Sequence, residues 1–510
     1  MPGIVTTKFR IHNAKQFYEA FSEPADINTR MYMFIARTRP WTTESSPPTP
    51  TDSFGATEYD VWRDMIAAKR ITASDRTHAV RRINWSNNTF YTPYTSTNGN
   101  LTSNNFFVVT DTYNVYKCID NNNGANSTVK PTTTTTSTVE VSDGYKWKFM
   151  YNISAADALK FLTTNYIPVK TLTSDDSSAQ WDVQQAASNG TIEAVLLTAG
   201  GSAYLESNGT IQLVNSTAIT LESKASGTDN IYNGSTLYIR SGLGSGQLKE
   251  IVDYTGATRI AIVNSAYTIT PNTSSQYHVG PKVSITGDGS GALAYANVSS
   301  GTITDINLIS GGSNYSSATT TITANSGTSA TAVSPVPPSG GHGADPIDEL
   351  LAFNIMLNTK FTGTESNTFV VNNDFRVIGI LKDPKLANGA QANSSVYDLT
   401  TKLTLTDISG TFQNDEVLDG GTSGASARIL AFANTNASGN SGVLSVSAVT
   451  GAFSASETVT GNTSSVTATV SSIDARDLQS YSGEVLYVEN RPPISRGASQ
   501  IEDVKLIVRF

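Results

Sequence analysis

Four histidines are the first residues to test for chemistry, because imidazole nitrogens bind metals and move protons near neutral pH. They are His12, His78, His278 and His342. None lies within four residues of another, so no pair has the spacing of a zinc motif. We expect structural roles for all four, with the His342 ring holding a turn between two glycines. The chain is predicted to have no metal site.

Glycine-rich segments offer the next candidates, because such loops can cradle phosphate groups. A dinucleotide site requires a strand before the loop, a helix after it and an acidic residue about 20 positions later. Residues 242–246 are followed by a strand pattern at 247–252, so we predict a β-turn there, and the same holds for 287–291. Residues 120–124 resemble the start of a calcium loop, but the twelfth position is Pro131 and not an acid.

Catalytic signatures are absent from the sequence. It has no nucleophile elbow and no phosphate-binding Gly-Lys-Ser/Thr, and the pair Asp175-Asp176 lacks partners placed for acid–base work. A hydrolase would need an acid pair in a recognisable frame. We therefore predict that the protein is not an enzyme, with no catalytic residues, cofactor or small-molecule substrate.

Composition and charge limit the possible partners. The 510 residues are only 15% charged and have a net charge of −9. A sequence-neutral nucleic-acid binder needs clustered Lys and Arg, and so does a protein that binds anionic membranes. We expect neither partner. Cys118 is the only cysteine, and the sequence has no signal peptide and no apolar run of spanning length. These features predict synthesis in a cytoplasm.

The elements that must position any site are mostly strands. Ser, Thr, Asn and Gly replace charged residues, and this pattern favours short strands joined by turns. Short helices are predicted only where a capping residue precedes an apolar stripe, and the predicted caps are Asn13, Thr57, Ser154 and Asp345. The second helix should carry Val61, Trp62, Met65 and Ile66, and the third should bury Ala158, Leu159 and Leu162.

Two internal repeats are present. In the first, residues 190–204 align with 301–315, and eight of the 15 positions are identical. Each copy reads as a strand, a Gly-Gly turn and a tyrosine. In the second, 410–429 aligns with 451–470 through shared Gly, Phe, Glu, Thr-Ser and Ala positions. Alternating small residues predict closely packed strands, in a narrow sandwich or a solenoid-like stack for the first repeat.

The fold class is predicted as mainly β with a few short helices: a discontinuous core domain that carries inserted β-sandwich-like repeat modules. A Pro/Gly-rich stretch at 334–341 marks the clearest boundary. The terminal strand 504–510 needs a partner, which we expect in the N-terminal domain. The predicted segments are the beginning of the core domain at 1–180, inserted repeats at 181–340, a return segment at 341–395, a second inserted module at 396–477 and completing strands at 478–510.

Several motifs at both ends of the chain carry a family resemblance. The longest is Ser-Gly-Glu-Val-Leu-Tyr-Val-Glu-Asn-Arg-Pro-Pro-Ile at 482–494. Other motifs occur in order at 4–10, 34–41, 50–53, 81–85, 116–120, 143–150 and 375–384. Together they resemble the baseplate wedge subunit of T4-like contractile-tailed phages, over about 1–170, 370–390 and 480–510. The repeats depart from that pattern.

The resemblance implies a structural virion protein of the tail baseplate. It implies a homodimer that links other wedge proteins during assembly and takes part in the rearrangement that triggers sheath contraction. It brings no catalytic residues. Possible interface residues are Arg81, Arg82, Trp85, Asn490 and Arg491, because Arg and Trp are enriched at binding hot spots.

A second function class stays open, namely a tail-associated receptor- or glycan-binding protein that uses exposed β repeats. Tyr204, Tyr277 and Tyr315 could stack on sugars, although packing of the Gly-Gly turns is the simpler role for them.

Overall fold

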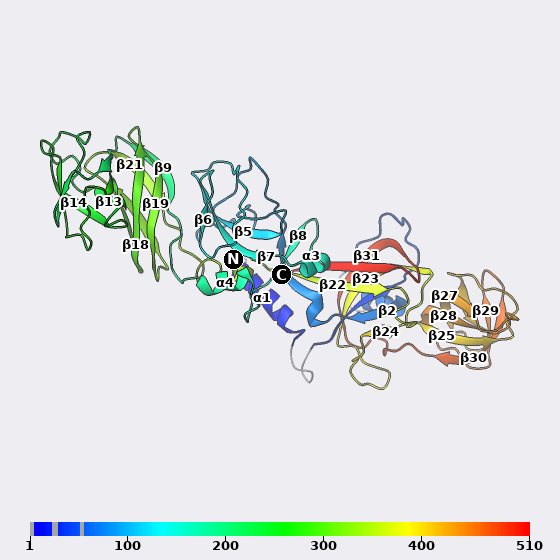
Figure 1. Ribbon diagram of the computed structural model, residues 1–510. Coiled ribbons are helices and arrows are strands. Elements are labelled where there is room, and N and C mark those ends of the chain that lie inside the picture. Colours follow the sequence, from blue (N-terminus) through cyan, green and yellow to red (C-terminus); the bar gives the residue numbers. More distant parts are fainter. Residues whose placement is uncertain (1–4, 23–28, 52–55) are drawn as a thin grey trace. The chain divides into compact units, whose positions relative to one another are not determined.

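The computed structural model describes residues 5–22, 29–51 and 56–510 (Figure 1). Ile4, Asp52 and Ser53, which belong to two of the resembling motifs, lie outside the described residues. The chain forms two compact units: unit 1 contains Met1–His78 and Phe353–Phe510, and unit 2 contains Ala79–Ala352. The two ends of the chain therefore belong to the same unit. The predicted fold class is confirmed, because strands far outnumber short helices.

Unit 1 contains a five-stranded sheet, a two-strand ladder and a closed barrel. The sheet order is β24-β2-β1-β23-β31, β22 pairs with β32, and the barrel order is β25-β28-β27-β26-β29-β30. The bounds are α1 (Thr7–Glu19), β1 (Met31–Ala36), α2 (Ala56–Asp64), β2 (Met65–Arg70), η1 (Ala73–Asp75), β22 (Asn354–Thr362), β23 (Asn373–Lys382), β24 (Val396–Asp398), β25 (Thr401–Thr406), β26 (Val417–Gly420), β27 (Ser426–Asn434), β28 (Gly442–Thr450), β29 (Thr458–Gly461), β30 (Thr467–Asp474), β31 (Glu484–Arg496) and β32 (Ile501–Arg509).

Strand β1 explains how this sheet is stabilised. All six of its residues are buried. Because side chains alternate across a strand, Met31, Met33 and Ile35 enter one apolar cluster while Tyr32, Phe34 and Ala36 enter another on the opposite face. A sheet covered on both faces requires continuous apolar strands. Gly379 on β23 lies opposite Phe34, and a Cβ there would meet the Phe34 ring at 2.2 Å.

The chain ends meet through different elements from those expected. The last strand, β32, pairs along its length with β22 and not with an N-terminal strand. The N-terminal contribution is helix α1, whose Phe17 ring lies 5.3 Å from the Phe510 ring. The Arg10 guanidinium donates to the Phe510 carbonyl and stacks 3.7 Å from the centre of the Phe353 ring.

Three predicted helices need correction. Helix α1 begins at Thr7 and not after Asn13, because the Thr6 side chain accepts from the Phe9 N–H at 3.2 Å and caps it first. Helix α2 ends at Asp64, since Met65 pairs with Ala36 and starts β2. The third helix was expected to bury Leu159, but that side chain is 74% exposed.

Unit 2 is built mainly from β-sheets. Its sheets have the orders β4-β5-β7-β6, β10-β16-β13-β14-β15-β12-β11, β19-β18-β17-β20 and β21-β9. The bounds are β4 (Phe107–Val109), β5 (Asn114–Asn121), β6 (Val139–Glu140), β7 (Tyr145–Asn152), α3 (Ala155–Phe161), β8 (Tyr166–Val169), α4 (Ala179–Ala186), β9 (Leu196–Ser202), β10 (Ser207–Thr210), β11 (Leu213–Val214), β12 (Ala218–Thr220), β13 (Thr236–Ser241), β14 (Leu248–Thr255), β15 (Ile260–Val263), β16 (Gln276–Gly280), β17 (Lys282–Gly287), β18 (Ser290–Ser299), β19 (Thr302–Ser313), β20 (Ala318–Thr323), β21 (Thr328–Val333) and α5 (Pro346–Glu349). Strand β3 (Arg76–Arg81) contains the chain boundary between the units.

The predicted caps of α3 and α5 are confirmed. The Ser154 hydroxyl accepts from the Asp157 N–H at 3.0 Å. The Asp345 carboxylate accepts from the Ile347 N–H at 3.0 Å, with Pro346 at the first helical position.

The copies of the first repeat bind each other reciprocally within unit 2. The Ile192 N–H donates to the Gly311 carbonyl at 3.0 Å, and the Tyr204 N–H donates to the Gly301 carbonyl at 3.0 Å. A Cβ on Gly311 would meet the Ile192 carbonyl oxygen at 2.3 Å. A Cβ on its counterpart Gly200 would meet a carbonyl of the other copy at 2.4 Å. Glycine is therefore required where the two backbones approach.

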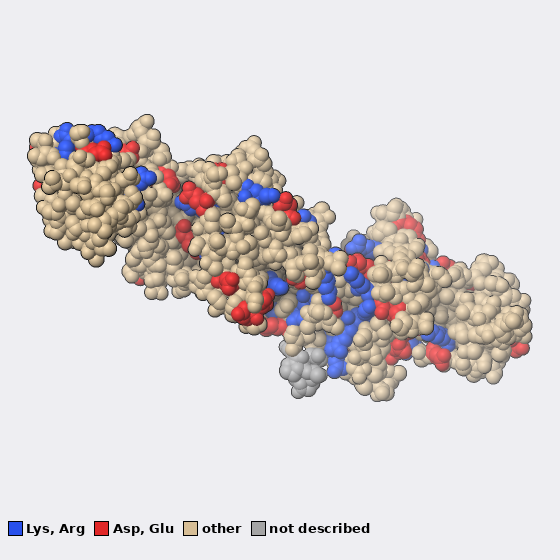
Figure 2. Space-filling model, in the orientation of Figure 1, with Lys and Arg blue, Asp and Glu red and all other residues tan. Residues whose placement is uncertain are grey.

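The second repeat builds the barrel. Strands β26 and β29 come from equivalent places in the two copies and pair with each other, with Leu418 opposite Gly461 and Gly420 opposite Val459. The strands of this module close into a barrel, which leaves no unpaired strand edge. No charged residue occurs between Arg428 and Glu457, and Figure 2 shows uncharged side chains over most of the visible barrel face.

Carboxylates clamp the barrel copies together. Glu416 of the first copy accepts from the Ser464 N–H at 2.8 Å and the Thr463 N–H at 3.0 Å. Glu457 of the second copy accepts from the Ser423 N–H at 3.0 Å. Burial alone would raise the pKa of each carboxyl group, but these donors outweigh it and lower the pKa of both.

Candidate functional site

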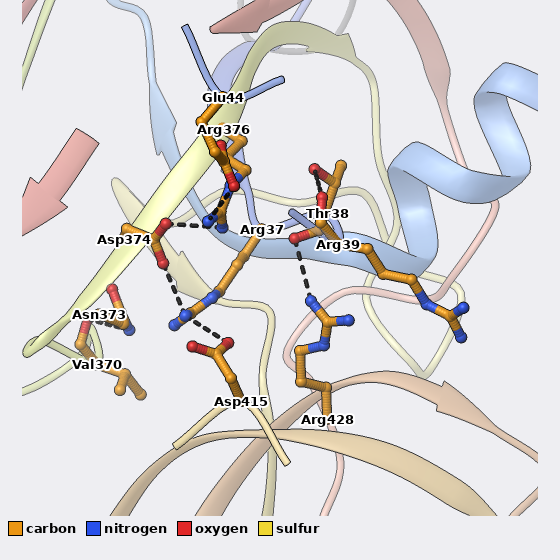
Figure 3. A network of polar contacts seen from close by, with 10 residues as sticks. All are labelled: Arg37, Thr38, Arg39, Glu44, Val370, Asn373, Asp374, Arg376, Asp415 and Arg428. Atoms are coloured by element: carbon orange, nitrogen blue, oxygen red, sulfur yellow. Dashed lines mark hydrogen bonds and ion pairs between the residues drawn. The ribbon is translucent and has the colours of Figure 1, made fainter. Parts of the chain in front are cut away.

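Arg37 is the centre of a buried polar network in unit 1 (Figure 3). It directly follows β1, and its N–H donates to the Asp64 carbonyl at 2.8 Å. The side chain is 4% exposed, and its Nη2 lies 2.7 Å from Asp374 of β23 and 2.5 Å from Asp415 of the barrel. One guanidinium thus joins the central sheet to the loop that precedes barrel strand β26.

A second arginine extends the network along β23. Arg376 lies 2.7 Å from the other oxygen of Asp374. Its Nε and Nη2 each donate to a different oxygen of Glu44 at 3.2 Å, which is a bidentate pairing. Glu44 belongs to the loop after β1, so this pair holds that loop against the sheet.

The barrel contributes its own arginine to this region. Arg428 on β27 donates to the Thr38 carbonyl at 3.2 Å. Burial lowers the pKa of Arg428, and the neighbouring Asp415 opposes that shift. Arg39 lies beside it and is exposed, and Figure 3 draws no interaction from its guanidinium.

The network is suited to fixing the barrel on the sheet and not to proton transfer. Arginine stays protonated at any physiological pH. Buried pairs of this kind add little net stability, but removing one partner costs about 3–5 kcal/mol because the other charge is left unpaired. The network therefore has a structural role, which is to hold segments of unit 1 together.

A cleft of about 590 Å³ adjoins this network. Its walls are residues between Thr38 and Thr51, residues of helix α2, and Val377, Val488 and Asn490. Two hydrogen bonds join the loop after β1 to β31. Trp41 Nε1 donates to the Arg491 carbonyl at 2.8 Å, and Asn490 Nδ2 donates to the Pro48 carbonyl at 2.8 Å.

Two predicted interface residues, Asn490 and Arg491, therefore lie beside the cleft. Pro492 and Pro493 do not end the strand, since β31 continues to Arg496. Two prolines are tolerated because β31 is an edge strand and its register shifts there. The exposed Arg491 side chain pairs with Glu489 at 2.9 Å.

The other three predicted interface residues lie in unit 2. The Arg81 guanidinium donates to the Asn104 carbonyl. Arg82 donates to Asn84 Oδ1 at 2.8 Å and to the Thr163 carbonyl at 3.2 Å. Trp85 Nε1 donates to the Ser127 hydroxyl at 3.2 Å. All three make hydrogen bonds inside unit 2, and an interface role for them stays a prediction.

The tyrosines considered as sugar platforms are buried. Tyr204, Tyr277 and Tyr315 are 3%, 1% and 4% exposed, so none offers a ring face to a ligand. Tyr204 and Tyr315 pack at the turns of the first repeat, where their hydroxyls accept from Ala330 and Ala292 N–H groups. His342 is buried beside Glu349 and Tyr94.

Sequence reasoning missed the network around Arg37. Its members are far apart in the chain, at 37–44, 374–376 and 415–428, and only the folded sheet brings them together. The available signal was an arginine directly after a wholly apolar strand. Among residues 5–22, 29–51 and 56–510, no cluster of His, Cys, Asp and Glu suited to a metal is present. No helix in these ranges is long and apolar enough to cross a membrane.

Comparison with known proteins identifies related sequences. The model of the family described as "Bacteriophage T4, Gp8" matches residues 3–135 and 424–510. The "Baseplate wedge protein gp8" of Enterobacteria phage T4 is 24% identical over 204 residues, which cover 33% of this chain and 60% of that protein. The chain thus spans about 60% of the length of this curated relative. Both matches show that parts of this chain are similar to the Gp8 family.

The matched ranges correct the expected extent of the resemblance. The match at 424–510 includes the second copy of the barrel repeat, which we had placed outside it. The motifs at 143–150 and 375–384 lie beyond the matched ranges.

Proposed function

We propose that this chain is a structural, non-enzymatic subunit of a contractile phage tail baseplate, made in the host cytoplasm and placed in the wedge. One observation carries the proposal. The two ranges that match the Gp8 family lie at opposite ends of the sequence, yet both supply strands to the five-stranded sheet of unit 1. Strand β1 comes from the first range and edge strand β31 from the second, with β23 between them.

The physical role follows from a rigid sheet with neighbours on several sides. A stable contact with another wedge protein would bury at least about 1,000 Å². A homodimer would use the same patch on both subunits. Movement during sheath contraction would then occur as rigid-body shifts between subunits, because packed interfaces switch between discrete arrangements.

The cleft beside Arg39 and β31 is the surface we assign to a neighbouring wedge protein. It combines an exposed arginine with Trp41 and Asn490, and the Arg37 network holds its walls. Arg81, Arg82 and Trp85 are kept as a second, separate interface prediction in unit 2. The predicted insertion of 181–340 and of 396–477 into the core also belongs to this proposal.

Mixing the purified chain with the other baseplate proteins of its phage tests this role. Size-exclusion chromatography with light scattering should show a dimer alone and a larger complex in the mixture. Arg39→Glu should weaken the complex at least about tenfold, as loss of a hot-spot residue does. Arg240→Glu, a charge reversal at another exposed arginine, is the matched control. A monomer that binds none of these proteins would contradict the proposal.

A receptor- or glycan-binding role for the inserted repeats is the second candidate. It is favoured by the position of these modules outside the matched family ranges. Deletion of 190–340 in the phage should abolish adsorption to host cells and leave baseplate assembly intact. Normal adsorption of such particles would exclude it.

A further inference from the structure

Lys117 and Glu349 form the most completely buried ion pair in the described residues of the protein. Lys117 lies on β5 and Glu349 ends α5, both in unit 2. Their side chains are 0% and 1% exposed, and Lys117 Nζ donates directly to Glu349 Oε2. Neither residue belongs to the Arg37 network or to the predicted interface residues.

The two oxygens of Glu349 have different surroundings. Oε2 faces the amine of Lys117. Oε1 accepts from two backbone donors, the Gly343 N–H at 2.7 Å and the Asp345 N–H at 3.2 Å. Paired backbone N–H groups on one carbonyl oxygen stabilise the negative charge that develops there when a nucleophile adds to the carbon. The carboxyl group is thus held in a position where a nucleophile could add to its carbon.

A residue that can carry protons lies near Oε2 of Glu349. Nδ1 of His342 is 3.9 Å from Glu349 Oε2 and has no hydrogen-bond partner. The ring is 2% exposed and stacks edge-on against Tyr94, whose centre lies 4.8 Å from Lys117 Nζ. This aromatic enclosure excludes water from the pair.

Burial also favours the neutral forms that can react. It lowers the pKa of Lys117 and raises the pKa of Glu349, although each group opposes the shift of the other. Burial likewise holds the pKa of His342 well below its usual value. A free amine is the nucleophile, whereas an ammonium is not.

We propose that Lys117 and Glu349 join through an amide bond between Lys117 Nζ and Glu349 Cδ. The amine lone pair forms the N–C bond, Oε1 carries the transient negative charge, and the Cδ–Oε2 bond breaks. Oε2 leaves as water with one proton from the acid and one from the amine, relayed by His342. No oxidant or cofactor is needed, and the step occurs once per chain.

Such a bond would close the chain around the inserted repeats. The two residues are separated by 232 positions, and that interval contains β9 to β21. Force or unfolding in the inserted modules would then not separate β5 from α5. This consequence is independent of the proposed baseplate role.

The test is the mass of the purified, full-length protein under denaturing conditions. We expect a mass lower than that of the sequence by one water, about 18 Da, and a branched peptide that joins Lys117 to Glu349 after proteolysis. A full sequence mass in freshly made and in aged protein would overturn the proposal. So would a deficit that maps to other residues. Neither measurement requires a variant to fold.

Variants then assign the roles. Lys117→Met should restore the full mass. Lys148→Met, which breaks the neighbouring ion pair with Glu193 at 3.2 Å, should keep the deficit. His342→Phe should slow the appearance of the deficit over time, while a purely structural role for His342 would leave that rate unchanged.

Discussion

The two repeats pair their copies in opposite ways. In the first repeat, the copies meet through backbone hydrogen bonds such as Ile192 to Gly311, at points where only glycine fits. In the barrel, the copies pair through strands β26 and β29 and are also held by the carboxylates of Glu416 and Glu457, each bound by the Thr-Ser turn of the other copy. One contact depends on the absence of side chains and the other on ionised side chains.

The difference has consequences for stability. Backbone pairing at glycine does not titrate, but it tolerates no added atom because the backbones are already in contact. Carboxylate pairing tolerates changes of shape but depends on charge, since hydrogen bonds to an ionised acceptor are about twice as strong as neutral ones. The two modules should therefore fail under different perturbations.

The largest effect is expected from Gly311→Ala. The new Cβ would meet the Ile192 carbonyl oxygen at 2.3 Å, so the two copies must separate. Overpacking of this kind costs up to about 3 kcal/mol. Hydrogen exchange of peptides from β9 and β19 should measure the loss as faster local opening. Gly99→Ala, where nothing lies within 4 Å, is the control and should change exchange little.

Glu457→Gln should have the next largest effect and should act on the barrel alone. The neutral amide loses the charge that its N–H and O–H donors stabilise, at a cost of about 2 kcal/mol. Peptides from β26 and β29 should exchange faster, with those from β9 unchanged. Asp419→Asn, on the same strand pair, serves as the matched control. Equal effects of both changes would rule out the clamp.

Acidification should weaken the barrel and the sheet that contains β16 at different pH values. The ordinary pKa of Glu is 4.5, and both barrel glutamates lie below it, so their stabilisation is complete above pH 4.5 and is lost as pH falls through the lowered values. Burial lowers the pKa of His278 below 6.5, so its neutral ring begins to lose stability below pH 6.5. Exchange corrected for intrinsic rates should show β16 weakening first. The reverse order would contradict these assignments.

The smallest effect is expected from removing one hydroxyl of the first repeat. Tyr204→Phe deletes the acceptor of the Ala330 N–H, and Tyr315→Phe deletes the acceptor of the Ala292 N–H. Each should cost about 1 kcal/mol, as a single neutral hydrogen bond does. Because the two positions are equivalent by repeat, their effects on exchange should match. A large difference between their effects on exchange would show that the two hydrogen bonds do not contribute equally to stability.

Much of the local structure could be predicted from the sequence. Ser154 and Asp345 cap their helices as expected, because a cap is decided by residues three positions apart. The repeats were visible as spaced Gly, Phe and Glu residues. Met65 shows where such reasoning fails, since its place in the apolar stripe of a helix was overridden by pairing with Ala36 of β1.

The candidate site could not be predicted in the same way. Arg37, Asp374 and Asp415 have no common spacing, and their charges pair only after β1 and β23 form neighbouring strands and the barrel closes. Asn490 was named as a possible interface residue, but its place beside the cleft depends on a strand that continues through two prolines. The sequence shows what chemistry each side chain can perform, but not which residues lie next to it in the fold.

The sequence by itself determined the strand-rich composition, the duplicated modules and the helix caps, because these depend on side chains close together in the chain. Tertiary structure alone decided which strand receives Ile501–Arg509, how the repeat copies face each other, and why Lys117 and Glu349 meet without water. Those contacts join residues that are far apart in the chain, and only burial in the folded units determines which of them form.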